Sequence, residues 1–281
     1  MQSDQPSTKV TILENGEEVR TEEIQKKEQG NHLIYLGGTT IPYVWQGEER
    51  IEYEGKEGTH MVNGKVYGVE LAKVPFEEIT SPEDVKGVAI KSEHFKYLPH
   101  FPNLLTVSLV EVDPNQMHYL AELSKVIVLD FGMKGDLTDE GLSHLISLTE
   151  VRAFNLLKTP ITDTGLAHLS NMKKLETLWL QGTNITGAGL VHLTGIENLS
   201  TLGLGDTDIQ DSDLAYLKDL QNISALSLIN TPLTDEAVEH LIELKKLEYL
   251  DIRSTNISEK GIQKLKYILP GCKIQFDSST T

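Results

Sequence analysis

A short pattern of leucines and one threonine returns at a fixed interval along this chain. Units of the form L-x-x-L-x-L-x-x-T-x-[IL] open at Leu175, Leu199, Ile223 and Leu247, each 24 residues after the last. They read LETLWLQGTNIT, LSTLGLGDTDIQ, ISALSLINTPLT and LEYLDIRSTNIS. A fixed period in this range predicts a stacked solenoid, because such a unit buries its apolar face only against its neighbours.

The repeat extends in both directions. Earlier units open at Val85, Leu104, Val126 and Val151, after which the step to the next unit is 19, 22, 25 and 24 residues. At the other end, GCKIQF places Ile274 and Phe276 on the two inner positions of one more strand. We therefore predict eight repeats and a terminal half-repeat over residues 85–276, with a tail at 277–281. The ragged early spacing suits atypical terminal units.

Each unit divides into a strand, a turn and a short helix. Leu178 and Leu180 alternate along the strand and point into the core, as a two-residue period requires. Leu142, Leu145 and Leu148 bury one face of a helix. The helix starts are predicted where a hydroxyl can cap free N–H groups and an adjacent acid favours the positive end of the helix dipole. These starts are Thr138-Asp139, Thr162-Asp163, Thr186, Thr234-Asp235 and Ser258-Glu259.

A threonine occupies the ninth position of five successive units. These residues are Thr159, Thr183, Thr207, Thr231 and Thr255. Because a hydroxyl both donates and accepts hydrogen bonds, each can bind backbone groups of its own turn and of the neighbouring turn. We predict a buried, structural threonine ladder.

The first third of the chain does not follow the repeat. We predict a flexible acidic leader over 1–30 and a β-rich unit over 31–84. Asn15-Gly16 and Asn63-Gly64 favour tight hairpin turns, and short strands are expected at 32–36, 43–45 and 50–54. The charged stretch 17–30 is either a solvated helix or a loop. The β-rich unit either caps the first repeat or is a separate binding domain.

Composition excludes several classes of function. The net charge of −17 argues against nucleic acid, since phosphate contacts need clustered Lys and Arg. No apolar run is long enough to cross a membrane, and no signal-peptide core follows Met1. The compartment stays open, because the polar start could also be the mature end of an exported protein. Cys272 is the only cysteine, so no intramolecular disulfide can form.

Several clusters resemble catalytic or metal sites, but their spacing does not fit. A histidine recurs at one place in four units, His144, His168, His192 and His240, yet equivalent residues on neighbouring helices lie about 8–10 Å apart, too far to share zinc. The acidic group Asp206, Asp208, Asp211 and Asp213 lacks the calcium-loop spacing, although a weak cation site there stays an alternative. An enzyme would need its site near Tyr53 and His60, where no nucleophile and base are suitably spaced. We expect no catalysis, cofactor or metal.

The units LTDEGLSHLISL, ITDTGLAHLSNM and ITGAGLVHLTGI, together with the ending LKYILPGCKIQF, resemble bacterial leucine-rich repeats with a T-D-x-G-L-x-x-L helix start. The resemblance covers residues 85–276. It implies an α/β solenoid with a parallel sheet on the concave face and helices on the convex face. It also implies that the chain binds other proteins, as most such proteins do.

The concave face is the predicted binding site. Its strand residues point away from the core, and Trp179 is the proposed anchor because tryptophan is enriched in binding hot spots. Gly203 and Gly205 are expected to leave an open space beside it. The other expected contacts are Arg152, Asn155, Leu157, Ile229, Tyr249, Asp251 and Arg253. The sequence thus predicts a monomeric, non-catalytic scaffold for a protein or peptide; the alternative is a secreted or surface adhesion protein.

Overall fold

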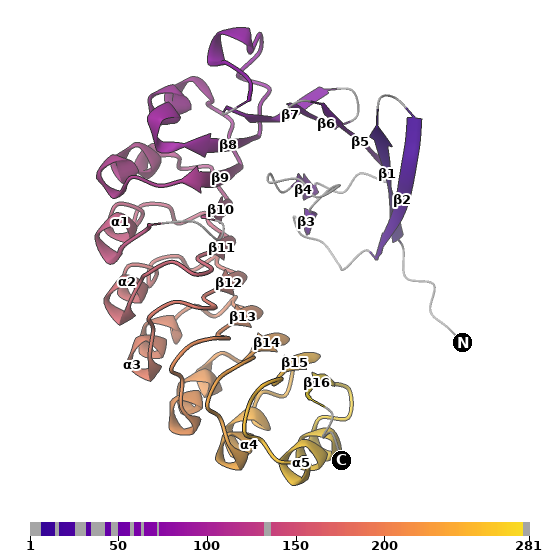
Figure 1. The fold of residues 1–281 in the computed structure, drawn as a ribbon, viewed down its shortest axis with the longest axis vertical. Coiled ribbons are helices and arrows are strands. Elements are labelled where there is room, and N and C mark those ends of the chain that lie inside the picture. Colours follow the sequence, from indigo (N-terminus) through magenta and orange to yellow (C-terminus); the bar gives the residue numbers. More distant parts are fainter. Residues whose placement is uncertain are drawn as a thin grey trace. The chain divides into compact units, whose positions relative to one another are not determined.

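Figure 1 shows the computed structural model of the chain, which describes residues 7–14, 17–25, 32–34, 43–45, 50–56, 59–62, 65–71, 73–131 and 136–277. The chain separates into two compact units, Met1–Val110 and Glu111–Thr281. The first repeat and most of the strand of the second repeat thus fall in the first unit, and the remaining repeat residues fall in the second. The domain boundaries drawn from the sequence stay predictions.

The first unit consists mainly of strands. They are β1 (Ser7–Glu14), β2 (Glu17–Gln25), β3 (His32–Ile34), β4 (Tyr43–Trp45), β5 (Arg50–Lys56), β6 (Thr59–Val62), β7 (Lys65–Glu70), β8 (Gly87–Lys91) and β9 (Thr106–Glu111). The main sheet has the order β9-β8-β7-β6-β5-β1-β2, and β3 pairs with β4 separately. Two 3-10 helices lie between these strands: η1 (Phe76–Glu78) follows β7, and η2 (Ser92–His100) follows β8. The strands predicted at 43–45 and 50–54 are confirmed as β4 and β5, and β3 confirms residues 32–34 of the strand predicted at 32–36, whose last two residues lie outside the described residues.

Residues 17–25 correct one prediction. They form strand β2, antiparallel to β1, and not the helix or loop expected for 17–30. β-branched residues at Val19, Thr21 and Ile24 suit a strand, and pairing with a neighbouring strand outweighs the helix preference of the intervening glutamates. The leader predicted over 1–30 therefore contains a β-hairpin pair. The Asn-Gly turns at 15–16 and 63–64 lie outside the described residues, between strands that pair antiparallel.

In the second unit each repeat adds one parallel strand. The strands are β10 (Val128–Asp130), β11 (Ala153–Asn155), β12 (Thr177–Trp179), β13 (Thr201–Gly203), β14 (Ala225–Ser227), β15 (Tyr249–Asp251) and β16 (Lys273–Gln275). The register follows the repeat, so Leu178 pairs with Phe154 on one side and Leu202 on the other.

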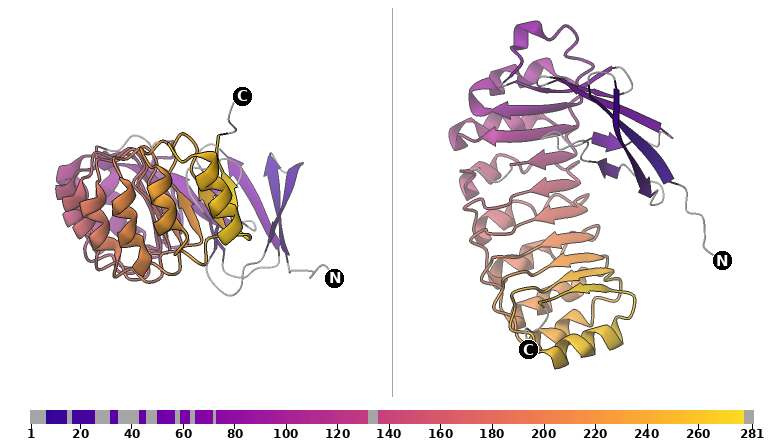
Figure 2. Two further views of the ribbon diagram at one scale, coloured as in Figure 1. Left: turned by 90° about the horizontal axis from the view of Figure 1, so that it is seen from below. Right: turned by 45° about the vertical axis from the view of Figure 1, so that its right-hand side comes forward.

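Short helices follow the strands of the second unit. They are η3 (Pro114–Glu122), α1 (Asp139–Ser143), α2 (Asp163–Ala167), α3 (Gly187–Leu190) with η5 (Val191–Leu193), η6 (Asp211–Asp219), η7 (Asp235–Ala237) with α4 (Val238–Leu241), and α5 (Glu259–Ile268). Within this unit the strands lie side by side along one face and the helices along the other (Figure 2). This arrangement confirms the predicted solenoid.

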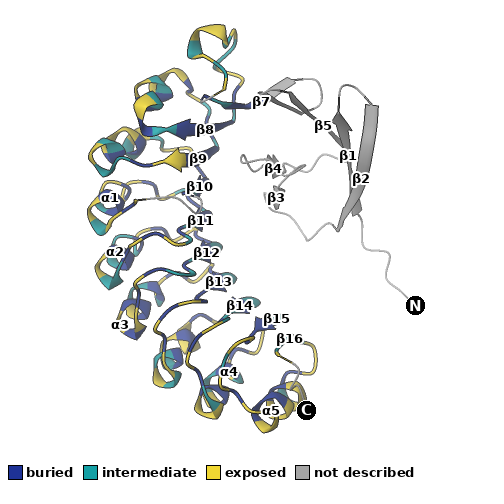
Figure 3. Ribbon diagram, viewed as in Figure 1, coloured by how far each residue is buried: buried dark blue, intermediate teal, exposed yellow. Residues whose placement is uncertain are grey.

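In the second unit the leucines of the repeats are buried between the sheet and the helices. Figure 3 shows buried residues on both the strands and the helices. Leu178 and Leu180 are 0% exposed, as are Leu166, Leu169 and Met172 on the facing helical side. The predicted inward alternation is confirmed. Truncating one such leucine to alanine typically costs about 2–5 kcal/mol of stability, so the stacked core dominates the energetics of the solenoid.

The turn after each strand uses a left-handed backbone. The eighth residues of five successive units, Lys158, Gly182, Asp206, Asn230 and Ser254, have φ between 53° and 69°. This conformation aims the backbone N–H at the next repeat: Lys158 donates to the Gln181 carbonyl at 2.8 Å, and the next three follow the same pattern. At the C-terminal end the Ser254 N–H donates instead to the side-chain carboxylate of Asp277, the equivalent residue, at 2.5 Å.

The last half-repeat is less covered than the rest. Ile274 and Phe276 occupy the predicted strand positions but are only half-buried, since no further repeat packs on them. Cys272 is also half-buried, and burial raises the pKa of its thiol to about 11. A thiol held neutral in this way is a poor nucleophile.

The helix starts join each repeat to the next. The hydroxyls of Thr138, Thr162, Thr186, Thr234 and Ser258 accept backbone N–H groups of the first turn, as predicted. The following aspartate reaches further than predicted: Asp163 accepts the N–H and the hydroxyl of Thr186 in the next repeat, at 2.8 and 2.7 Å. We call this two-bond contact the turn clamp. It also joins Asp139 to Thr162, Asp211 to Thr234 and Asp235 to Ser258.

The turn clamp explains the glycine in the T-D-x-G spacing. A Cβ on Gly189 would lie 2.4 Å from Oδ1 of Asp163, and a Cβ on Gly165 would lie equally close to Asp139. Each glycine therefore makes room for the aspartate of the preceding repeat.

At one junction, between the repeats opened by Leu175 and Leu199, a different contact takes the place of the turn clamp. Gly187 stands where four other repeats carry aspartate (Asp139, Asp163, Asp211 and Asp235), and Asp213 stands where four repeats carry glycine (Gly141, Gly165, Gly189 and Gly261). The Asp213 carboxylate accepts the N–H of Gln210, in its own repeat, at 2.8 Å. A Cβ on Gly187 would lie 1.9 Å from Cγ of Asp213. Aspartate and glycine have thus exchanged places, and we call this the exchanged junction.

Candidate concave binding face

The strand register brings the predicted contact residues into one row. Asn155, Trp179, Gly203, Ser227 and Asp251 end strands β11 to β15 and are paired partners in the sheet. The side chains of Leu157, Ile229 and Tyr249 lie on either side of this row along their own repeats, and all three are half-buried, like Trp179. The face therefore presents partly exposed apolar groups across successive repeats.

The prediction of an open space beside Trp179 is wrong. A Cβ on Gly203 would lie 2.3 Å from Nε2 of Gln181 and 2.5 Å from its Cδ, so the Gln181 side chain covers this glycine. A Cβ on Gly205 would lie 2.4 Å from Cγ2 of Ile229 and 3.3 Å from Cγ of Gln181. The two glycines form a floor on which side chains from both neighbouring repeats lie, and both are buried. We call Gly203 and Gly205 the glycine floor.

The polar residues at the ends of the row hold the turns in place. The Asn155 side chain accepts the Leu157 N–H at 3.0 Å and donates to the Asp130 carboxylate at 3.0 Å. Asp251 takes the equivalent role and accepts from the Arg253 N–H at 3.2 Å. These groups shape the face through bonds inside the protein.

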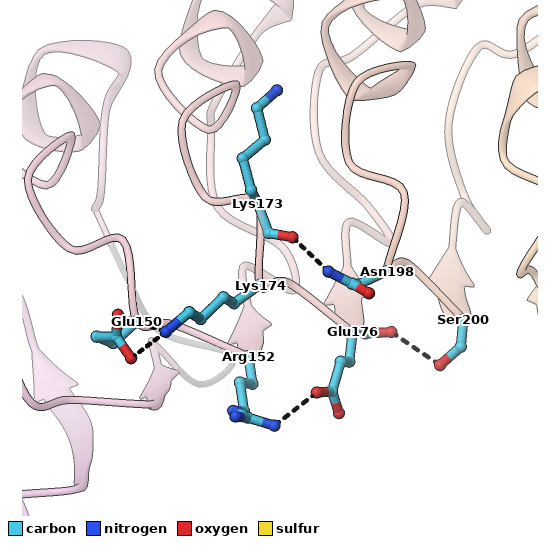
Figure 4. Close-up of polar contacts among 7 residues, drawn as sticks. All are labelled: Glu150, Arg152, Lys173, Lys174, Glu176, Asn198 and Ser200. Atoms are coloured by element: carbon cyan, nitrogen blue, oxygen red, sulfur yellow. Dashed lines mark hydrogen bonds and ion pairs between the residues drawn. The ribbon is translucent and has the colours of Figure 1, made fainter.

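Both arginines expected at the site are already paired with acids. Arg253 donates to Asp251 from Nε at 2.9 Å and from Nη2 at 2.6 Å. This side-chain bond holds the pKa of Asp251 below its usual range and raises the pKa of the Arg253 guanidinium. Arg152 Nη1 lies 2.9 Å from Oε1 of Glu176 (Figure 4). Neither arginine is an uncompensated positive charge that would call for an acidic partner.

Figure 4 also shows further polar contacts between successive repeats near Arg152. Lys174 pairs with Glu150 at 2.6 Å, and the Asn198 side chain donates to the Lys173 carbonyl at 2.8 Å. Ser200 donates to the Glu176 carbonyl at 3.1 Å. Exposed pairs of this kind contribute little stability each.

The threonine ladder is present, but its bonds stay within each repeat. Every hydroxyl donates to the backbone carbonyl three residues earlier, and Thr207 reaches that of Leu204 at 2.6 Å. Thr159, Thr183, Thr207 and Thr231 are buried, whereas Thr255 near the end is half-buried. The bond to the neighbouring turn that the sequence suggested is made by the turn clamp.

The acidic cluster is used by the fold. Asp206 accepts from Asn230 at 2.6 Å, Asp211 forms a turn clamp, and Asp213 bonds Gln210. Within the described ranges, no three His, Cys, Asp or Glu residues are placed to hold a metal ion. Tyr53 and His60 lie where side chains are not described. In the described part of the chain, no helix combines the length and the apolar character needed to cross a membrane.

Comparison with known proteins agrees with this architecture. A family model described as leucine rich repeat matches residues 243–266. The structure of internalin C2 from Listeria monocytogenes is similar over 70% of this chain and 82% of that chain, with 19% identity and a TM-score of 0.54. A leucine-rich-repeat protein of Leptospira interrogans is similar over 69% of this chain and 55% of that one, with 18% identity and a TM-score of 0.45. No curated protein sequence matches the chain.

Residues 243–266 thus match a leucine-rich repeat, and the chain has the leucine-rich-repeat fold seen in internalin C2. The expected resemblance is confirmed.

Sequence reasoning overlooked Gln181. It occupies the seventh position of its repeat, one of the positions assigned to the concave face, but a lone glutamine gives no sign of where its amide lies. The available signal was the pair of glycines in the next repeat, which we interpreted as empty space.

Proposed function

We propose that this protein is a non-catalytic scaffold that binds a protein or peptide across the concave face of its second unit, with Trp179 as the anchor. The observation that carries the proposal is the row of half-exposed apolar side chains, Leu157, Trp179, Ile229 and Tyr249, on a sheet whose other face is already buried. The core does not need these groups, because Leu178 and Leu180 fill it from the same strand.

The spacing suits one ordinary interface. Adjacent strands lie about 4.8 Å apart, so Tyr249 on β15 is about 14 Å from Trp179 on β12. A standard interface buries about 800 Å² on each partner. Because the nearby arginines are paired, recognition rests on apolar contact and hydrogen bonding more than on net charge.

A displayed library of random linear peptides, selected on the intact chain, tests the proposal. Trp179→Ala should weaken binding of the selected peptides by at least about 2 kcal/mol, as at a buried hot spot. Its unfolding midpoint should barely move, since the indole lies outside the core. Tyr267→Ala is the matched control, because Tyr267 is an aromatic residue 87% exposed on α5. Peptides that bind Trp179→Ala as tightly as the native chain would place the site elsewhere.

A further inference from the structure

Gln181 lies against the glycine floor in the middle of the concave face. The Gly203 position, where a Cβ would lie within 2.5 Å of Nε2, Cδ and Oε1, shows that the whole amide rests on β13. The Ile229 side chain approaches the other end of the floor from the following repeat. Any side chain on either glycine would prevent this arrangement, so the floor exists to receive the Gln181 side chain.

The Gln181 amide has no hydrogen-bond partner among the described residues. Its Oε1 is buried and accepts no hydrogen bond, and its Nε2 donates to no residue of the described part of the chain. A buried polar atom left unpaired is unfavourable. Turning the amide off the floor therefore breaks no hydrogen bond, and an incoming group can pair both of its atoms.

The chemistry of the Gln181 amide limits which chemical groups of a partner can bind it. A primary amide offers a donor and an acceptor side by side. A carboxylate would satisfy only the donor, and an ammonium group only the acceptor. An extended peptide segment presents the N–H and the C=O of one residue on the same side, and this unit satisfies both. Trp179 and Ile229 flank Gln181 with apolar surface that can receive the side chains on either side of such a unit.

We propose that the amide of Gln181 is a specificity-determining contact that binds the main chain of an extended peptide segment lying across the concave face. Nε2 donates to the C=O of the segment, and Oε1 accepts an N–H. The inference rests on the proposed function, because it specifies what the same face recognises. An Asn or Gln side chain of the partner carries the same pair of groups, and the test below distinguishes binding of such a side chain from binding of the main chain.

The test uses peptides selected from a random linear library on the intact chain. Gln181→Leu should weaken their binding about threefold to tenfold, the loss expected for one or two hydrogen bonds. Gln181→Glu keeps the size but removes the donor, and should also weaken binding. Gln263→Leu, an exposed glutamine on α5, is the matched control and should leave affinity unchanged. Unfolding midpoints of all three variants should stay near that of the native chain.

N-methylation of the bound peptide, one position at a time, identifies the group that Gln181 recognises. One methylated position should weaken binding to the native chain and have no further effect on Gln181→Leu. If alanine replacement of a peptide Asn or Gln shows this coupling instead, the main-chain assignment is overturned. Peptides that depend on Trp179 but bind Gln181→Leu normally would refute this inference alone. Failure to select any peptide, or peptides indifferent to Trp179, would refute the proposed function as well.

Discussion

Junctions with a turn clamp and the exchanged junction solve the same problem in two ways. At a clamped junction, Asp163 reaches into the next repeat and holds both the N–H and the hydroxyl of Thr186. At the exchanged junction the Gln210 N–H is also satisfied by a carboxylate, but that of Asp213 in its own repeat. The backbone group is paired in both cases, yet only the clamp adds a bond between repeats along the convex turn.

The exchanged junction is also the one that carries the glycine floor. Trp179 and Gln181 belong to its first repeat, and Gly203 and Gly205 to its second. Departures from the local rules of a fold are expected at functional or strained sites. Two independent departures, one on each face, at a single junction therefore support placing the binding site there.

The largest expected effect comes from forcing the consensus aspartate into the exchanged junction. Gly187→Asp would place a Cβ 1.9 Å from Cγ of Asp213 and set two carboxylates together. We expect a loss of about 2–4 kcal/mol in the free energy of unfolding, measured by urea denaturation. Adding Asp213→Gly should recover most of this loss, because the pair then matches a clamped junction.

Asp208→Ala serves as the control for this cycle, since the exposed Asp208 carboxylate bonds no described residue. It should change stability by less than about 0.5 kcal/mol. A double variant no more stable than Gly187→Asp alone would show that the exchange of aspartate and glycine is not the cause.

A smaller effect is expected from the threonine ladder, which does not distinguish the two kinds of junction. Thr207→Val removes a buried hydroxyl that donates to the Leu204 carbonyl at 2.6 Å, and should cost about 1–3 kcal/mol. Thr159→Val, beside clamped junctions, should cost the same, because each bond lies within one repeat. Unequal unfolding midpoints would mean that the ladder contributes to cohesion between repeats. An unchanged midpoint for Thr207→Val would refute its structural role.

The 24-residue period was enough to predict the fold. Position within the repeat decides burial, so the inward leucines, the helix starts and the hydroxyl caps follow from spacing alone. Contacts between repeats were harder to predict. The sequence around Asp163 is the same whether its carboxylate interacts with the dipole of its own helix or binds the next repeat. The prediction of open space at Gly203 and Gly205 was wrong for a similar reason. A glycine in the sequence shows that a side chain is absent, but it does not show which neighbouring side chain fills that space. Strand β2 was missed because pairing with β1 decides its state.

The smallest expected effect is the pH dependence of one turn clamp, the one between Asp235 and Ser258. The pKa of Asp235 lies below the ordinary aspartate value of 3.8, first because the Ser258 hydroxyl donates to it and next because the Ser258 N–H does. A carboxyl whose pKa is lowered by folding contributes stability above its unfolded pKa and loses that contribution as the pH falls through the folded value. This clamp should therefore weaken only below about pH 4. Ser258→Ala removes the larger of the two causes and should move the pKa of Asp235 upwards, as an NMR titration of its carboxyl carbon would measure. Because the N–H bond remains, the shift should be partial; a pKa that does not move would mean that the hydroxyl does not hold the carboxylate in solution.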